Sequence, residues 1–236
     1  MNRRLIYAVA ATLMAVACTT EWDSGCVLFL LEEGEVTEHT KGTVRDYAEL
    51  PHLDSLSLTI EDSSLKRIFD GGLSDWNPDT KMTPGDYCAS VSYGDPSAEG
   101  PGAACFAGYA DFTIKAGELT TAIVDVRLGN SIVKIETTET FRNYFPASCF
   151  TISTPLNPQG FIYDGTAVFV SGAFSVKGTV KSQSGTESAL EEKTWRGEPS
   201  TCYTVKYDVT NAGGLAIQVS FDNTVQTVEL GEISLN

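Results

Sequence analysis

Apolar and polar positions alternate along most of the chain after residue 24. Alternation places every second side chain on one face of an extended strand, so each such segment predicts a half-buried β-strand. No window of ten or more residues carries an apolar stripe at helical spacing, and Thr140–Phe145 predicts one helical turn at most. The predicted strands are Val27–Leu31, Leu56–Ile60, Tyr87–Tyr93, Phe106–Ile114 and Thr121–Leu128, followed by Ser131–Glu136, Ser148–Ser153, Thr166–Val170, Phe174–Val180, Thr201–Val209, Leu215–Ser220 and Thr224–Leu230.

Turn-forming residues separate these strands, and Lys115–Glu118 predicts a tight hairpin in which Gly117 takes a positive φ. Short strands at this spacing are typical of β-sandwiches, and the length suits two of them. We expect an all-β protein with a first sandwich over residues 25–128 and a second over 129–236, divided at Gly129. The strands on either side of Gly129 could instead form one continuous hairpin.

The first residues look like an export signal. A short basic stretch precedes Leu5–Ala17, 13 residues without a charge, which is too short to span a bilayer and suits a signal-peptide core. Ala15-Val16-Ala17-Cys18 resembles a bacterial lipobox, in a loose form without the usual leucine. This predicts a signal peptide over 1–17, a lipid-modified Cys18 and a tether over 18–24. The alternative is an ordinary cleaved signal.

Charge narrows the range of partners. The formal net charge is −15, and cleavage after residue 17 removes two of 16 basic residues and none of 31 acidic ones, giving −17. Binding of nucleic acid requires a basic surface, so nucleic acid is not an expected partner. No later stretch of the sequence approaches 18 apolar residues, the length that a membrane-spanning helix needs. We therefore expect acyl chains on Cys18 to attach the protein to the outer membrane.

Five cysteines follow Cys18 in an exported chain, where disulfides can form. Cys88 and Cys105 flank a loop rich in glycine and proline, which makes them the preferred pair, and Cys149 with Cys202 is a weaker one. An odd number leaves at least one thiol unpaired. All five could instead be small buried residues.

Candidate chemistry is scarce. The chain has no phosphate-binding loop, no dinucleotide fingerprint and no zinc motif, and its two histidines, His39 and His52, lie in a polar segment. Glu32-Glu33 and Glu191-Glu192 are adjacent acids, which point to opposite faces of a strand and do not converge. We therefore expect no enzyme, no catalytic residue, no metal centre and no cofactor beyond the lipid.

Two weaker patterns concern ligands. Asp75–Asp79 begins like a calcium loop but has Thr80 where glycine is required, so an Asx turn is the simpler interpretation. Trp76 and Trp195 stand in polar, turn-rich contexts, and a solvent-facing tryptophan can stack on a sugar ring. The alternative for both tryptophans is partial burial against loops.

Four segments carry a resemblance to a known family: Met82–Tyr87, Ala89–Gly100, Phe106–Glu118 and Leu128–Ile135. They resemble an uncharacterised family of Bacteroidetes lipoproteins, described as a domain of unknown function and related in style to fimbrillin-type proteins. The resemblance implies two tandem transthyretin-like or fimbrillin-like antiparallel β-sandwiches on a lipid anchor, and it transfers no catalytic residue. The acidic residues after Cys18 look like the tether that sends such lipoproteins to the cell surface.

These observations favour a non-enzymatic surface lipoprotein, structural or adhesive, such as a fimbria-associated anchor or accessory subunit. Thr224–Leu235 is a candidate for strand addition between chains, or an ordinary last strand. Fimbrillin-like subunits are processed after an arginine, for which Arg45 is the candidate, although a plain loop is the simpler interpretation. The alternative function is a glycan-binding surface module that uses its exposed tryptophans.

Overall fold

The computed structural model describes residues 23–33, 50–209, 215–221 and 224–229. Of residues 32–33 and of the last two segments it describes only the backbone. The chain divides into two compact units. The first contains residues 23–33, 50–93 and 106–127, and the second contains 94–105 and the described residues from 128 onward. Each unit is described separately.

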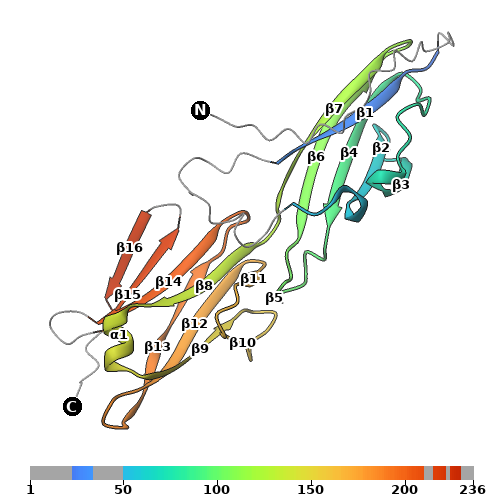
Figure 1. Ribbon diagram of the computed structural model, residues 1–236. Coiled ribbons are helices and arrows are strands. Elements are labelled where there is room, and N and C mark those ends of the chain that lie inside the picture. Colours follow the sequence, from blue (N-terminus) through green and yellow to red (C-terminus); the bar gives the residue numbers. More distant parts are fainter. Residues whose placement is uncertain (1–22, 34–49, 210–214, 222–223, 230–236) are drawn as a thin grey trace. The chain divides into compact units, whose positions relative to one another are not determined.

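The first unit holds six strands in one sheet, in the order β1-β7-β6-β4-β2-β3 (Figure 1). Two short 3-10 turns, η1 (Leu53–Ser55) and η2 (Leu73–Asp75), lie between strands. The strands are β1 (Cys26–Glu33), β2 (Ser57–Asp62), β3 (Arg67–Gly72), β4 (Gly85–Tyr93), β6 (Phe106–Ile114) and β7 (Leu119–Leu128).

Alternation in sequence becomes a buried face in this sheet. Leu58 and Ile60 on β2 pair with Val91 and Ala89 on β4, and all four side chains are at most 1% exposed. The intervening positions of these strands are polar. Burial of the apolar face supplies the main favourable free energy of the unit.

The second unit packs two sheets against each other. A four-stranded sheet has the order β10-β9-β12-β13, and a six-stranded sheet has the order β16-β15-β14-β8-β11-β5 (Figure 1). The strands are β5 (Gly100–Pro101), β8 (Ser131–Thr137), β9 (Ala147–Ser153), β10 (Phe161–Ile162), β11 (Val168–Val170), β12 (Ala173–Lys181), β13 (Glu187–Arg196), β14 (Cys202–Val209), β15 (Leu215–Phe221) and β16 (Thr224–Glu229).

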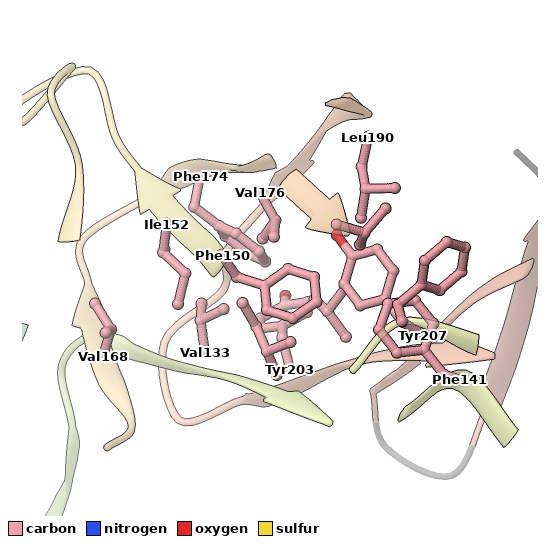
Figure 2. Packing of buried hydrophobic residues seen from close by; sticks show 14 of the residues in the cluster. Val133, Phe141, Phe150, Ile152, Val168, Phe174, Val176, Leu190, Tyr203 and Tyr207 are labelled. Carbon is pink, nitrogen blue, oxygen red and sulfur yellow. The ribbon is translucent and has the colours of Figure 1, made fainter. Parts of the chain in front are cut away.

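Both sheets of the second unit contribute to one hydrophobic core (Figure 2). Phe150 and Phe174 come from the four-stranded sheet, and Val133, Tyr203 and Tyr207 from the six-stranded sheet. This is the layered arrangement of a β-sandwich.

The single α-helix of the described residues, α1 (Glu139–Tyr144), adds an aromatic residue to this core. Thr138 caps it, since its hydroxyl oxygen accepts a hydrogen bond from the Phe141 N–H (3.1 Å). Phe141 is completely buried. The expectation of one short helical turn here is confirmed.

The all-β fold is confirmed, but two of its features differ from the expected antiparallel sandwiches. β1 pairs with β7 in parallel, and β8 pairs with β14 in parallel. Alternation of side chains is the same in parallel and antiparallel strands, so the sequence pattern did not reveal the direction of pairing.

The expected division at residue 128 also needs correction. Residues 94–105, which connect β4 to β6, belong to the second unit, where β5 pairs with β11. A boundary drawn once along the chain misses this segment because the pairing joins residues far apart in sequence.

Two long strands were missed, β3 and β13. The pairing of β13 with β12 shifts register between Val176 and Gly178, two positions on the same face of β12. Val176 pairs with Lys193 and Gly178 pairs with Leu190, so the two partners on β13 are three residues apart instead of two. Such a β-bulge interrupts the two-residue period that identifies strands. In β3 the register also shifts, and the strand ends in two glycines.

Candidate functional site

Trp76 lies in the core of the first unit and is only 9% exposed. Its indole N–H donates a hydrogen bond to the carbonyl oxygen of Val27 (3.1 Å), and its ring makes edge contacts with Phe29 and Phe69, with centroids 5.8 and 5.2 Å apart. Phe29 and Phe69 come from β1 and β3, the two outermost strands of the sheet. Trp76 therefore bridges these two strands, and the expectation of a solvent-facing ring that could stack on a ligand is wrong.

Trp195 lies within β13 and is half-buried against the core of the second unit. Its ring stacks on Phe174 with centroids 5.6 Å apart and an interplanar angle of 29°. One face of the indole is therefore occupied, and a ligand would have to use the other face or the edge. Trp76 belongs to the first unit and Trp195 to the second.

The structure does not bring Cys88 and Cys105 together. Cys88 pairs with Asp111 on β6, whereas Cys105 immediately precedes Phe106, which pairs with Tyr93 at the far end of β4. Five strand positions separate Asp111 from Phe106, about 17 Å along the sheet and well beyond the reach of a disulfide. Both residues are free thiols, so the predicted bridge is wrong for this fold.

The weaker cysteine pair is not assembled either. Cys149 is an exposed free thiol on β9 in the four-stranded sheet. Cys202 is buried on β14 in the six-stranded sheet. The two residues therefore lie on different layers of the second unit.

The segment that resembles a calcium loop forms an Asx turn. The side-chain oxygen of Asn77 accepts a hydrogen bond from the Asp79 N–H (3.0 Å), and the Thr80 N–H binds the Asn77 carbonyl (3.0 Å). Among the residues that the structure describes, no three acidic, histidine or cysteine side chains gather in a way that could hold a metal ion.

Several predicted positions fall outside the described residues: Cys18 and the tether up to residue 22, His39, and Arg45. His52, in contrast, is described and lies at an exposed turn beside Asp54 (3.1 Å). Across the described part of the chain, no helix is long and apolar enough to cross a membrane.

The chain enters the first unit through a close fit at Gly25. Gly25 and Met82 exchange two backbone hydrogen bonds of 2.9 Å each. A Cβ atom at position 25 would lie 2.4 Å from the Lys115 carbonyl oxygen and 2.8 Å from the Ile114 side chain. Only glycine allows this approach without displacing the backbone of the neighbouring hairpin.

The β6–β7 hairpin holds the entering chain from the other side. The Gly117 N–H donates to the Ser24 carbonyl oxygen (2.8 Å), and the Cys26 N–H donates to the Glu118 carbonyl oxygen (3.0 Å). Gly117 has the positive φ, +74°, that the sequence predicted. The chain from Ser24 to Cys26 is thus hydrogen-bonded on both sides where β1 begins.

The polar face of the first sheet carries an exposed aromatic residue that the sequence reasoning missed. Tyr109 on β6 is 74% exposed and pairs with Ser90 on β4. Tyr109 is three residues before the buried Phe112 in the same strand, so alternation places the two on opposite faces of the sheet. This spacing is the sequence signal that could have identified Tyr109 as exposed. The next row of this face places Cys88 between Glu61 and Asp111.

The thiol of Cys88 is a poor nucleophile in this setting. Partial burial raises its pKa, and the adjacent Asp111 and the charge of Glu61 raise it further. A raised pKa lowers the thiolate fraction at neutral pH. This thiol therefore lacks the activation of a catalytic cysteine.

The outermost strands differ in how well they are protected against pairing with another chain. β13 has a bulge and charged residues, and its Lys193 shares the face of the buried Val176. Inward-pointing charges and bulges discourage strand addition. β16 is the outermost described strand of the six-stranded sheet and pairs with β15 over six residues without a register shift.

The comparisons with solved structures return β proteins of Bacteroidetes at low similarity. A DUF1812 protein from Bacteroides thetaiotaomicron has 10% identity and a TM-score of 0.45, covering 89% of this chain and 99% of the other. The fimbrial anchor protein Mfa2 from Porphyromonas gingivalis has 10% identity and a TM-score of 0.37, covering 86% and 98%. A fimbrial assembly protein from Parabacteroides distasonis has 9% identity and a TM-score of 0.42, covering 88% and 99%.

At these identities and TM-scores, no residue role transfers from those proteins. A search of curated proteins gives no match. A family model described as "Domain of unknown function (DUF4493)" matches residues 23–234, nearly the whole chain. This confirms the resemblance to an uncharacterised family with a domain of unknown function. The chain therefore belongs to the DUF4493 family.

Proposed function

We propose that the protein is a non-enzymatic cell-surface lipoprotein that acts as an anchor or accessory subunit of an adhesive assembly. The observation that carries the proposal is the outer edge of β16, beside which no other described strand lies. Its neighbour β15 is paired in continuous register, and no bulge interrupts the pairing. An unbroken edge strand offers a row of backbone donors and acceptors to which a strand of another chain can add.

A cross-linking experiment on intact cells tests this contact. A photo-reactive residue replaces Gln226 in one variant and Thr227 in another, so that two successive positions of the strand, which belong to opposite faces of a sheet, are both tested. The control carries the same residue at Ser184, an exposed position in the turn between β12 and β13. We expect a larger adduct from at least one β16 variant and none from the control. Equal adducts at all positions, or none, would contradict strand addition.

The lipid anchor is the second part of the proposal. Cys18 follows small residues at the end of an uncharged segment, a pattern that supports export and acylation of this cysteine. Cells fed an alkyne-bearing fatty acid should label the protein, and Cys18→Ser should remove the label and release the protein from the membrane fraction. Equal labelling of Cys18→Ser would contradict the anchor.

The N-terminus of the protein isolated from cells distinguishes anchoring from processing. A lipid-blocked Cys18 supports the anchor, whereas a chain that begins at Asp46 supports cleavage after Arg45. The two results exclude each other for a given molecule. Mass spectrometry of the first peptide measures both.

The glycan-binding alternative is weaker than the sequence indicated, because Trp76 is buried. Trp195 remains with one ring face covered by Phe174. Binding on a glycan array that is lost in Trp195→Ala, but not in the matched surface variant Tyr144→Ala, would favour this function. No binding above background would remove it.

A further inference from the structure

We propose that the first unit is a mechanical clamp, which resists tension between a membrane anchor and the second unit by loading the β1–β7 pair along the strands. This inference rests on the proposed function in one respect, because the proposed membrane attachment is the source of the tension. The clamp itself is a property of how the described strands are connected.

The parallel pairing of β1 and β7 sets the direction of the load. Cys26 at the start of β1 lies beside Leu119 at the start of β7, and the two strands run side by side to Glu33 and Val126 (Figure 1). The tether enters at the start of β1, whereas β7 continues into the second unit after residue 127. Tension therefore pulls β1 and β7 in opposite directions along their common axis.

The other described connections to the second unit leave from the same end of the sheet. β4 ends at Tyr93 and β6 begins at Phe106, and these two residues are paired. At the opposite end, Gly85 pairs with Ile114 next to the hairpin that holds the tether. Whichever of these strands carries the load, the tension runs from the end of the sheet that holds the tether to the end that contains Tyr93 and Phe106.

Loading along the strands engages the ladder as a whole. In a parallel pair the hydrogen bonds are evenly spaced, and sliding the strands past each other strains all of them together. If β1 were pulled away sideways from one end, the bonds would instead break one after another. The first geometry requires a higher force because no single bond carries the load.

Contacts on the outer side of β1 brace the strand. The Trp76 indole N–H binds the Val27 carbonyl oxygen (3.1 Å), and Met82 exchanges two backbone hydrogen bonds with Gly25. On the inner side of β1, the Phe29 ring lies in edge contact with Phe112 of β6, with centroids 5.6 Å apart. β1 is therefore held on both sides at its tether end, where the tension would act.

Single-molecule force spectroscopy on the full mature chain tests the clamp. One handle is attached to the N-terminal amine at position 18 in a Cys18→Ser background. The second is attached through an azide-bearing residue that replaces Ala107 or Ala116, exposed alanines at opposite ends of the sheet. The 18–107 pair loads β1 along the strands, and the 18–116 pair peels it from the tether end.

We expect the rupture force of β1 at one loading rate to be severalfold higher for the 18–107 pair. Equal forces, or a higher force for the 18–116 pair, would overturn the clamp. Because the measurement uses purified protein without a membrane, that failure would leave the lipid-anchor experiment on Cys18 untouched.

Two neighbouring proline variants provide a second test. The Cys26 N–H points toward β7, so by alternation the Leu30 N–H also points toward β7 and the Leu31 N–H points away. At constant force along the strands, Leu30→Pro should unfold about tenfold faster than Leu31→Pro, since it removes a ladder hydrogen bond. Equal rates would overturn the clamp, and if Leu30→Pro fails to fold, the comparison of the two handle pairs decides.

Discussion

At the scale of single residues, the hydroxyl of Tyr207 is a polar group that is buried in the second unit without a hydrogen-bond partner among the described residues. Its side chain is fully buried, and its ring lies 4.6 Å from that of Phe150 and 5.9 Å from that of Phe141, centroid to centroid (Figure 2). Burial raises the pKa of the hydroxyl well above its ordinary value. The hydroxyl has no hydrogen-bond partner among the described residues, so its lost hydration is not replaced.

Tyr207→Phe should raise the free energy of unfolding by about 1 kcal/mol, because it removes this unpaired group and keeps the ring. Chemical denaturation measures the change. Tyr203→Phe is the matched control and should lower stability, since the Tyr203 hydroxyl accepts from the Glu198 N–H (3.0 Å) and donates to the Arg196 carbonyl oxygen (3.1 Å). Loss of stability in both variants would contradict this account.

Cys88 and Cys149 should differ in reactivity. The pKa of the Cys88 thiol is raised by partial burial and by Asp111, so less of it is thiolate at any pH below that pKa. Cys149 is exposed. The reaction is run on the native protein at about pH 7.5, roughly one unit below the ordinary pKa of a thiol. Iodoacetamide should then modify Cys149 before Cys88. Peptide mass spectrometry over time measures both rates, and Asp111→Asn should speed the reaction at Cys88.

The segment 94–105 is the decisive piece at the scale of elements. It supplies β5 to the edge of β11, and Glu99 fixes it there by accepting hydrogen bonds from the Ser171 N–H (2.9 Å) and the Thr154 hydroxyl. The Asn130 side-chain amide also donates to the Ala103 carbonyl oxygen (2.7 Å). A loop that looked like a connection between two strands therefore completes the sheet of the second unit.

Glu99→Ala should loosen this segment by about 1–3 kcal/mol, because the Ser171 N–H and the Thr154 hydroxyl lose a charged acceptor. Hydrogen exchange of residues 94–105 should become faster, with little change in β4 or β6. Glu192→Ala, which also removes one exposed carboxylate, is the control. Unchanged exchange in Glu99→Ala would show that β5 is held by its backbone pairing alone.

The whole molecule consists of two units with separate cores, and substitutions in each should act independently. Gly25→Ala should destabilise the first unit by about 1–3 kcal/mol, because its Cβ would overlap the Lys115 carbonyl oxygen. Tyr207→Phe should change only the second unit. Their effects should be additive and appear in different protected segments by hydrogen exchange. A single transition that shifts with either variant would contradict independent units.

The sequence by itself determined the β character and most strand positions. Residues 106–114 were predicted as one strand and form β6 over the same residues. The hairpin at Lys115–Glu118 was also predicted correctly, since its glycine is needed for a positive φ. These features depend on side-chain periodicity and local backbone preference, which a short stretch of chain carries in full.

Tertiary structure alone decided the direction of pairing, the partners of each edge and the burial of Trp76. Its sequence neighbours are polar because they form a turn, yet its ring points into the core and meets β1, 49 residues earlier. The parallel β1–β7 pair and the insertion of residues 94–105 likewise join distant segments. Such contacts depend on which surfaces meet in three dimensions, and the periodicity of a single strand contains no record of its partner.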